Sequence, residues 1–167
     1  MAGVPVVRVV ASPLERTLET ARLVFPGLEP DVDDGLIECD YGQWQGATLA
    51  ELANHEMWSA VQQRPDEVVF PGGEAMADMA QRASTAVREW DARICTDHGA
   101  GAVWAAVSHG DVIKAIVADA LGLPLRRFQS LQVEPASVSV VRYGEHGAAV
   151  VKWNESGDSW LESLTAA

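Results

Sequence analysis

Two apolar strands that run directly into amphipathic helices constrain the fold of this chain more than any other feature. The first strand covers Val4–Val10 and is rich in valine, and the second is the segment AVWAAV at 102–107. After each strand, apolar residues recur at helical spacing within 14–25 and within 112–121. Strands that are apolar on both faces are typical of parallel sheets covered by helices on both sides. The pattern therefore predicts an α/β fold, a three-layer αβα sandwich with a mostly parallel sheet.

The rest of the chain is expected to supply loops, further helices and a last pair of strands. The expected elements are an irregular loop at 28–46, a short helix at 48–62, a helix from Ala75 to Cys95, and neighbouring strands at 136–143 and 148–153. No internal repeat or linker interrupts this order. Residues 1–167 are therefore taken as a single domain.

The turn after the first strand has the residues of a helix N-terminus. Ser12 is expected to cap the helix, Pro13 to occupy its first position, and Glu15 to complete a capping box. The second helix is expected to run from Asp111 to Leu121, because Gly122 follows directly.

The bulk composition excludes several classes of partner. With a formal net charge of -12, the chain is not expected to bind nucleic acid or anionic membranes, because both attract basic surfaces. No apolar stretch reaches the ~20 residues of a membrane span, and export is not expected, because the first residues lack the pattern of a signal peptide. Cys39 and Cys95 lack a CxxC spacing and are expected to be reduced thiols of a cytoplasmic protein. No metal-spaced cluster appears, so neither a metal nor a cofactor is expected.

The turns after the two apolar strands are the expected binding site, since ligands gather at the carboxyl ends of strands in open α/β sheets. Arg16 lies one turn into the first helix, and His109 lies in the turn that starts the second. Helix N-termini favour anions, and a guanidinium adds bidentate recognition of phosphate or carboxylate. We therefore expect Arg16 and His109 to form a positive pocket in an acidic surface. Alternatively, His109 only caps the following helix or fills space, and Arg16 is a solvated helical arginine.

Four segments, in this order and at these separations, carry a family resemblance. They are SPLERTLETA (12–21), LIECDYGQWQG (36–46), FPGGE (70–74) and VSHGDVIKAI (107–116). Together they resemble the histidine phosphatase superfamily, in its phosphoglycerate mutase-like branch, over nearly the whole chain. The resemblance implies a phosphate pocket of two Arg and two His beside a carboxylic acid. It also implies a phosphohistidine intermediate in the hydrolysis of a phosphomonoester of a small metabolite.

Carried onto this chain, the resemblance assigns three catalytic residues. Arg16 matches the second Arg, His109 matches the second His, and Glu38 matches the acid that protonates the leaving oxygen. Ser12 and Gly110, which flank these turns, are expected to help bind the phosphate. These roles agree with phosphoryl transfer, in which the protein mainly positions the group and neutralises its oxygens.

An acid near neutral pH needs a raised pKa, which apolar surroundings provide. Tyr41 and Trp44 are the expected neighbours that remove water from Glu38. Without the motif, Glu38 would be taken for a solvated loop carboxylate, and Asp40 is the reserve candidate. Glu74 in the FPGGE loop is expected either to orient part of the site or to start the following helix.

The R-H-G motif, which carries the family's nucleophilic His and first Arg, does not occur in this sequence. Val4–Val10 corresponds to the family's second strand, so the N-terminal strand and helix are expected to be missing. A misplaced start is favoured over a genuine short form, because the acid, the second Arg and the second His remain. The missing strand would leave backbone groups unpaired. We therefore expect low solubility or a homodimer that covers the gap, and a stable monodisperse monomer would contradict this.

Three alternatives to a phosphatase stay open. A non-catalytic phosphate-binding or regulatory protein would use Arg16 and His109 only as ligands. A phosphoglycerate mutase-type phosphotransferase would have to protect its intermediate from water. A serine hydrolase would use Ser108, because the segment AVSHG resembles the GxSxG turn. That alternative requires His146, the only histidine of this sequence after the AVSHG turn.

Overall fold

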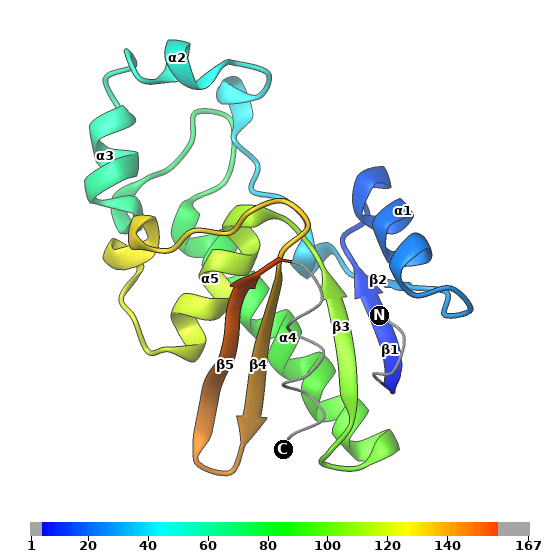
Figure 1. Ribbon diagram of the computed structural model, residues 1–167. Coiled ribbons are helices and arrows are strands. Elements are labelled where there is room, and N and C mark those ends of the chain that lie inside the picture. Colours follow the sequence, from blue (N-terminus) through cyan, green and yellow to red (C-terminus); the bar gives the residue numbers. More distant parts are fainter. Residues whose placement is uncertain (1–4, 157–167) are drawn as a thin grey trace.

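The computed structural model describes residues 5–156 and contains a parallel three-stranded sheet with the strand order β2-β1-β3 (Figure 1). The strands of this sheet are β1 (Val6–Ala11), β2 (Asp31–Val32) and β3 (Val103–Val107). The helices are α1 (Glu15–Val24), α2 (Leu49–Leu52), α3 (Trp58–Gln63), α4 (Met76–His98) and α5 (Gly110–Ala120). The predicted α/β class is confirmed. Val4, where the first strand was expected to begin, lies outside the described residues.

Helices cover both faces of the central strand. Val9 and Ala11 of β1 pack with Ala21 of α1 and with Phe25, which directly follows that helix, whereas Val10 belongs to the main core with residues of α4 and α5. Because successive side chains of a strand point to opposite faces, this alternation gives three layers, namely α1, the sheet, and α4 with α5 (Figure 1). The three predicted layers are therefore those observed. Full burial of a valine side chain between them stabilises the fold by roughly 1.5–3 kcal/mol.

The two apolar strands end at the same level. Ala11 lies opposite Val107, and the N–H of Ser12 donates to the carbonyl of Val107 at 3.0 Å. The turns that follow β1 and β3 therefore lie side by side. This register brings the start of α1 next to the start of α5.

The first turn of α1 differs from the prediction. The helix begins at Glu15, and its N-cap residue is Leu14 with no side-chain cap. The expected Ser12 cap and its capping box with Glu15 are wrong, because the fully buried Ser12 hydroxyl lies against His109 instead. Pro13 precedes the helix and does not occupy its first position. The hydroxyl of Thr17 donates to the carbonyls of Ser12 and Leu14 and so stabilises the turn.

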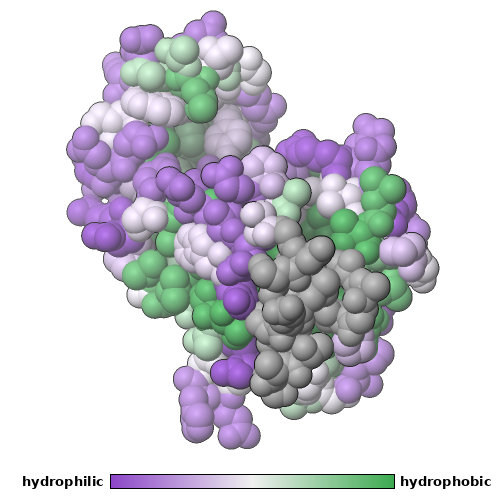
Figure 2. Space-filling view, viewed as in Figure 1, coloured by the Kyte–Doolittle hydropathy of each residue, from purple (hydrophilic) through white to green (hydrophobic). Residues whose placement is uncertain are grey.

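The other helix boundaries differ in smaller ways. The segment 48–62 forms two helices, α2 and α3, rather than one, and α4 continues past Cys95 to His98. The segment 28–46 was expected to be an irregular loop, but it contains strand β2, which pairs with β1, and short 3-10 helices; the remainder is irregular. Helices α2 and α3 form a lobe beyond the carboxyl ends of β1 and β3 (Figure 1). The outline of the molecule is notched between this α2–α3 lobe and α1 (Figure 2).

The last two strands form an antiparallel hairpin, as the alternating pattern predicts. Strands β4 (Val138–Gly144) and β5 (Gly147–Glu155) pair only with each other within residues 5–156. In the same range β3 pairs only with β1. An unpaired strand edge can accept another strand, so the expected homodimer along such an edge stays a prediction.

Candidate active site

The candidate site lies at the two strand-to-helix turns that the sheet register brings together. Three side chains from distant parts of the sequence meet there: Arg16 of α1, Glu38 of the loop after β2, and His109 before α5. Arg16 Nη2 lies 3.0 Å from His109 Nδ1 and 4.0 Å from Glu38 Oε2. His109 Nδ1 lies 3.7 Å from Glu38 Oε2. The sequence-predicted acid, Arg and His therefore occupy one site.

His109 is held rigidly between two partners. It is the N-cap residue of α5, but its side chain makes no cap hydrogen bond, and the residue is only 6% exposed. Because a guanidinium can only donate, Nδ1 accepts from Arg16, and Nε2 carries the ring proton. Nε2 donates that proton to the Ser12 hydroxyl oxygen at 2.7 Å. The ring therefore does not cap the helix, and both of its nitrogens have hydrogen-bond partners.

The pKa of His109 is lowered from 6.5 to about 4, first by burial and then by the positive charges of Arg16 and Arg82. At neutral pH the imidazole is therefore uncharged. A neutral ring explains how it can lie 3.0 Å from a guanidinium without repulsion.

The lowered pKa of His109 predicts an acid-dependent loss of stability. Between pH 6.5 and about pH 4 the unfolded chain binds a proton that the folded ring does not, so the free energy of unfolding falls as the pH falls. The expected loss is about 3 kcal/mol across this interval. Urea unfolding of wild type and His109→Gln at several pH values measures it.

As the pH falls, wild type should lose this stability relative to His109→Gln. The titration of Glu38 also contributes to the pH dependence of stability, but both proteins contain Glu38, so its contribution cancels in the comparison. His98→Gln is the matched control, because His98 is an exposed histidine at the end of α4. The free energy of unfolding of His98→Gln should fall with pH as that of wild type does, because His109 is unchanged in this variant. Parallel curves for wild type and His109→Gln would contradict a buried, uncharged ring.

Arg16 presents most of its guanidinium to solvent. It is the second residue of α1, its side chain is 61% exposed, and one N–H is used by His109. A guanidinium has five N–H donors, so further donors face the exterior. The first turn of α5, which starts at Gly110, adds backbone N–H groups and the positive end of a helix. These features suit an anion.

Glu38 is partly buried, with its side chain 25% exposed. Burial is the main cause that raises its pKa, and the charge of Asp111 also raises it. The backbone N–H of Cys39 and the charge of Arg16 oppose the rise. The expectation of a carboxyl with a raised pKa is therefore confirmed. Tyr41 is one neighbour, as predicted, whereas Trp44 packs in an aromatic cluster with Trp58 and Phe70.

Arg82 of α4 holds the loop that carries Glu38, and the sequence reasoning missed it. Its guanidinium donates to the carbonyls of Gly35, Ile37 and Glu38 at 3.0, 2.8 and 3.2 Å. It also pairs with Glu74 at 2.7 Å. One side chain thereby satisfies several carbonyls of an irregular loop.

Glu74 and Asp40 are both used within the loops. Glu74 Oε1 accepts from the backbone N–H of Asp40 at 2.9 Å, so the expectation that Glu74 orients part of the site describes its contacts. The Asp40 carboxylate accepts from the Gly42 N–H and the Gln45 amide and is exposed. A Cβ on Gly73 would lie 2.1 Å from the Asp40 carbonyl oxygen. The FPGGE loop thus packs backbone to backbone against the Glu38 loop.

Ser12 and Gly110 occupy the predicted turns, but the Ser12 hydroxyl is fully buried beneath His109. It therefore acts on the His109 ring in this structure, and its expected contact with phosphate stays a prediction.

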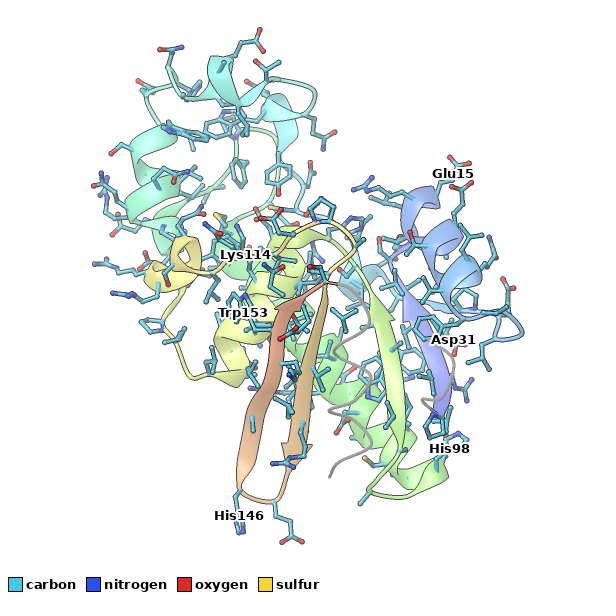
Figure 3. The ribbon with its side chains drawn as sticks, in the orientation of Figure 1. Glu15, Asp31, His98, Lys114, His146 and Trp153 are labelled. Atoms are coloured by element: carbon cyan, nitrogen blue, oxygen red, sulfur yellow. The ribbon has the colours of Figure 1, made fainter. Side chains whose placement is uncertain are left out.

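The serine hydrolase alternative depends on Ser108 and His146. The Ser108 hydroxyl donates to the Leu36 carbonyl at 2.8 Å. His146, which a serine hydrolase would need, lies in the turn of the β4–β5 hairpin, at the end of the molecule opposite Glu15 (Figure 3).

Within residues 5–156, no group of three or more His, Cys, Asp or Glu side chains is placed to hold a metal ion. None of the helices in that range is both long and apolar enough to cross a membrane.

A parallel α/β sheet with Arg, His and Glu side chains at its carboxyl end agrees with the phosphoglycerate mutase-like class that the sequence motifs resemble. The family model of the histidine phosphatase superfamily (branch 1) matches residues 1–156. The chain therefore belongs to the histidine phosphatase superfamily.

Relatives of known sequence include a bifunctional protein, Rv2228c of Mycobacterium tuberculosis, which is 34% identical over 157 residues. The match covers 89% of this chain but 41% of that protein, so the chain spans about two fifths of its length. Phosphoserine phosphatase 1 of Hydrogenobacter thermophilus is 31% identical, with 93% of this chain and 75% of that protein covered.

Solved structures agree with the fold. YhfR of Bacillus stearothermophilus has a TM-score of 0.80 and 26% identity, covering 93% of this chain and 77% of that one. The mycobacterial glucosyl-3-phosphoglycerate phosphatase Rv2419c has a TM-score of 0.79 and 26% identity, covering 92% and 79%. The expected phosphoglycerate mutase-like fold is therefore confirmed.

Proposed function

We propose that this chain forms the phosphate-binding and proton-donating part of a phosphomonoester hydrolase for small phosphorylated metabolites. One observation carries the proposal. The side chains of Arg16, Glu38 and His109 lie within 4.0 Å of one another, at the carboxyl ends of two parallel strands. An exposed guanidinium, a hydrogen-bonding ring and a carboxyl with a raised pKa are the groups that ester cleavage requires.

A phosphate enters this pocket from the exposed side of Arg16. Its oxygens accept from the guanidinium and from backbone N–H groups at the start of α5. The bound dianion favours the charged form of His109, so the ring takes up a proton and donates to the phosphate through Nδ1. Ser12 continues to accept from Nε2 and keeps the ring in place.

Glu38 supplies the proton for the leaving group. A histidine nucleophile forms a bond to phosphorus, the ester P–O bond breaks, and its electron pair remains on the ester oxygen. That oxygen takes the proton of Glu38 and departs as an alcohol. Water then attacks the phosphohistidine, gives a proton to the Glu38 carboxylate, and releases inorganic phosphate. The nucleophile belongs to the family's R-H-G motif, which residues 1–167 do not contain.

Hydrolysis is proposed rather than phosphotransfer to a second substrate. Two relatives, phosphoserine phosphatase 1 and glucosyl-3-phosphoglycerate phosphatase, are phosphatases by name. Their named substrates are small phosphorylated metabolites, which supports that substrate class here. Arg16 is also largely exposed, so water reaches the pocket.

The test is the Glu38→Gln variant in a chain extended upstream by an R-H-G segment. Loss of the proton donor should slow the cleavage of alkyl phosphates by about 100-fold or more. Cleavage of p-nitrophenyl phosphate should slow much less, because its leaving group departs without a proton. Initial rates on the two esters measure the difference.

Asp40→Asn is the matched control, since it neutralises the carboxylate two residues away and keeps an acceptor oxygen for the Gly42 N–H. It should retain the rates on both esters. Equal slowing of both esters by Glu38→Gln would assign the acid elsewhere. Phosphate binding without turnover by the extended chain would establish the phosphate-binding or regulatory alternative.

A further inference from the structure

A chain of side-chain contacts leads from Glu38 into α5. Tyr41 Oη lies 3.5 Å from Glu38 Oε1 and 2.9 Å from Asp111 Oδ2. Asp111 is the second residue of α5, and its other carboxylate oxygen lies 3.3 Å from Lys114 Nζ. Lys114 projects from the part of α5 near the carboxyl end of β3 (Figure 3). The phenol of Tyr41 therefore stands between two carboxyl groups.

The phenol has one proton, and geometry decides which carboxyl receives it. An O–H···O bond has its optimum near 2.7–2.8 Å, so the 2.9 Å contact with Asp111 takes the proton and the 3.5 Å contact with Glu38 does not. The lone pairs of the phenol oxygen then face Glu38. Lone pairs turned toward Glu38 are compatible with a neutral carboxyl group, which can donate a hydrogen bond, but they offer no donor to a carboxylate.

Tyr41 itself remains a neutral phenol. Burial raises its pKa well above the ordinary value, and the charges of Asp111 and Glu38 raise it further. Its ring packs edge-on against Phe70, with the centroids 5.1 Å apart. The hydroxyl is thus a fixed link rather than a group that titrates.

We propose that Asp111 is a positioning residue for the acid: by accepting the Tyr41 proton it turns the lone pairs of the phenol oxygen toward Glu38, which favours the protonated, proton-donating form of that carboxyl group. The inference rests on the proposed role of Glu38. It assigns Asp111 no contact with the substrate.

Charged and polar groups from α1, α4, α5 and its own loop lie near Glu38. They are Arg16 of α1, His109 and Asp111 at the start of α5, Tyr41 of its own loop, and Arg82 of α4, which donates to the Glu38 carbonyl. Of the side-chain charges that act on the pKa of Glu38, Asp111 raises it and Arg16 lowers it.

Asp111→Asn changes two of these influences in the same direction. It removes the negative charge that raises the pKa of Glu38. Its side-chain N–H can also donate to the phenol oxygen, which turns the Tyr41 proton toward Glu38. A donor aimed at Glu38 stabilises the carboxylate. Both effects lower the pKa of Glu38.

The experiment is a titration of the Glu38 side-chain carboxyl by carbon-detected NMR, assigned by the signal missing in Glu38→Gln. Asp111→Asn should lower the Glu38 midpoint relative to wild type. Asp119→Asn is the matched control, because it makes the same change further along α5, where Asp119 pairs with Arg88. That control should leave the midpoint unchanged, and amide spectra of each variant verify the fold.

Tyr41→Phe separates orientation from charge. In the Tyr41→Phe background, the shift caused by Asp111→Asn should shrink to its through-space part. A shift equally large in both backgrounds would overturn the proposal, as would equal shifts for Asp111→Asn and Asp119→Asn. Because the titration needs no turnover, it stays informative if Glu38→Gln fails to slow ester cleavage. In that case the proposed function fails while the link from Asp111 to Glu38 stands.

Discussion

Arg16→Ala is expected to weaken the binding of inorganic phosphate by about 100-fold. A guanidinium that donates two charge-assisted hydrogen bonds to an anion contributes about 3 kcal/mol. The Arg16 side chain is 61% exposed and uses one contact to hold His109, so its remaining donors are available to phosphate. Isothermal titration calorimetry with phosphate, and with vanadate as a second anion, measures the loss.

Arg22→Ala is the matched control for this variant. Arg22 lies on the same helix, and its guanidinium pairs with the exposed Glu29, so the substitution removes one positive charge without touching the site. Phosphate affinity should therefore change little. Equal losses for the two variants would mean that general charge, rather than a pocket at Arg16, attracts the anion.

The same Arg16→Ala variant should also change the titration of His109. After burial, the charge of Arg16 is the next cause that lowers the pKa of this ring. Its removal should move the His109 midpoint upward, and ring-proton NMR measures this shift. A fixed midpoint would contradict the 3.0 Å contact between the guanidinium and Nδ1.

The layers and the meeting of the two turns follow from local sequence patterns. Apolar runs specify the buried strands, and helical spacing specifies α1 and α5, because each depends on residues a few positions apart. The contact between Arg16 and His109 spans 93 positions. It was still predictable, because parallel strands end at one edge and place the following turns together.

The parts that sequence reasoning missed depend on side-chain direction. Ser12 has the residue type of a helix cap, but the register of β1 against β3 buries it under His109. The bond from Tyr41 to Asp111 joins residues 70 positions apart. No periodicity marks such a contact, since it depends on how an irregular loop packs against α5.

Arg82→Met is expected to destabilise the protein by about 3 kcal/mol. The substitution keeps much of the apolar stem but leaves the carbonyls of Gly35, Ile37 and Glu38 without their charged donor. It also leaves Glu74 without its cation, and loss of one partner from a largely buried pair costs about 3–5 kcal/mol. Urea unfolding, followed by tryptophan fluorescence, measures the change in the free energy of unfolding.

Two further variants decide whether this loss comes from the geometry of the guanidinium. Arg88→Met removes an arginine of the same helix that is 55% exposed and pairs with Asp119, so it should cost no more than about 1 kcal/mol. Arg82→Lys keeps the charge, but an ammonium group lacks the planar fork that reaches several carbonyls at once. It should therefore recover only part of the stability. Full recovery by lysine would assign the effect to the ion pair with Glu74 alone. The Glu38 loop would then hold its shape without the hydrogen bonds from the Arg82 guanidinium.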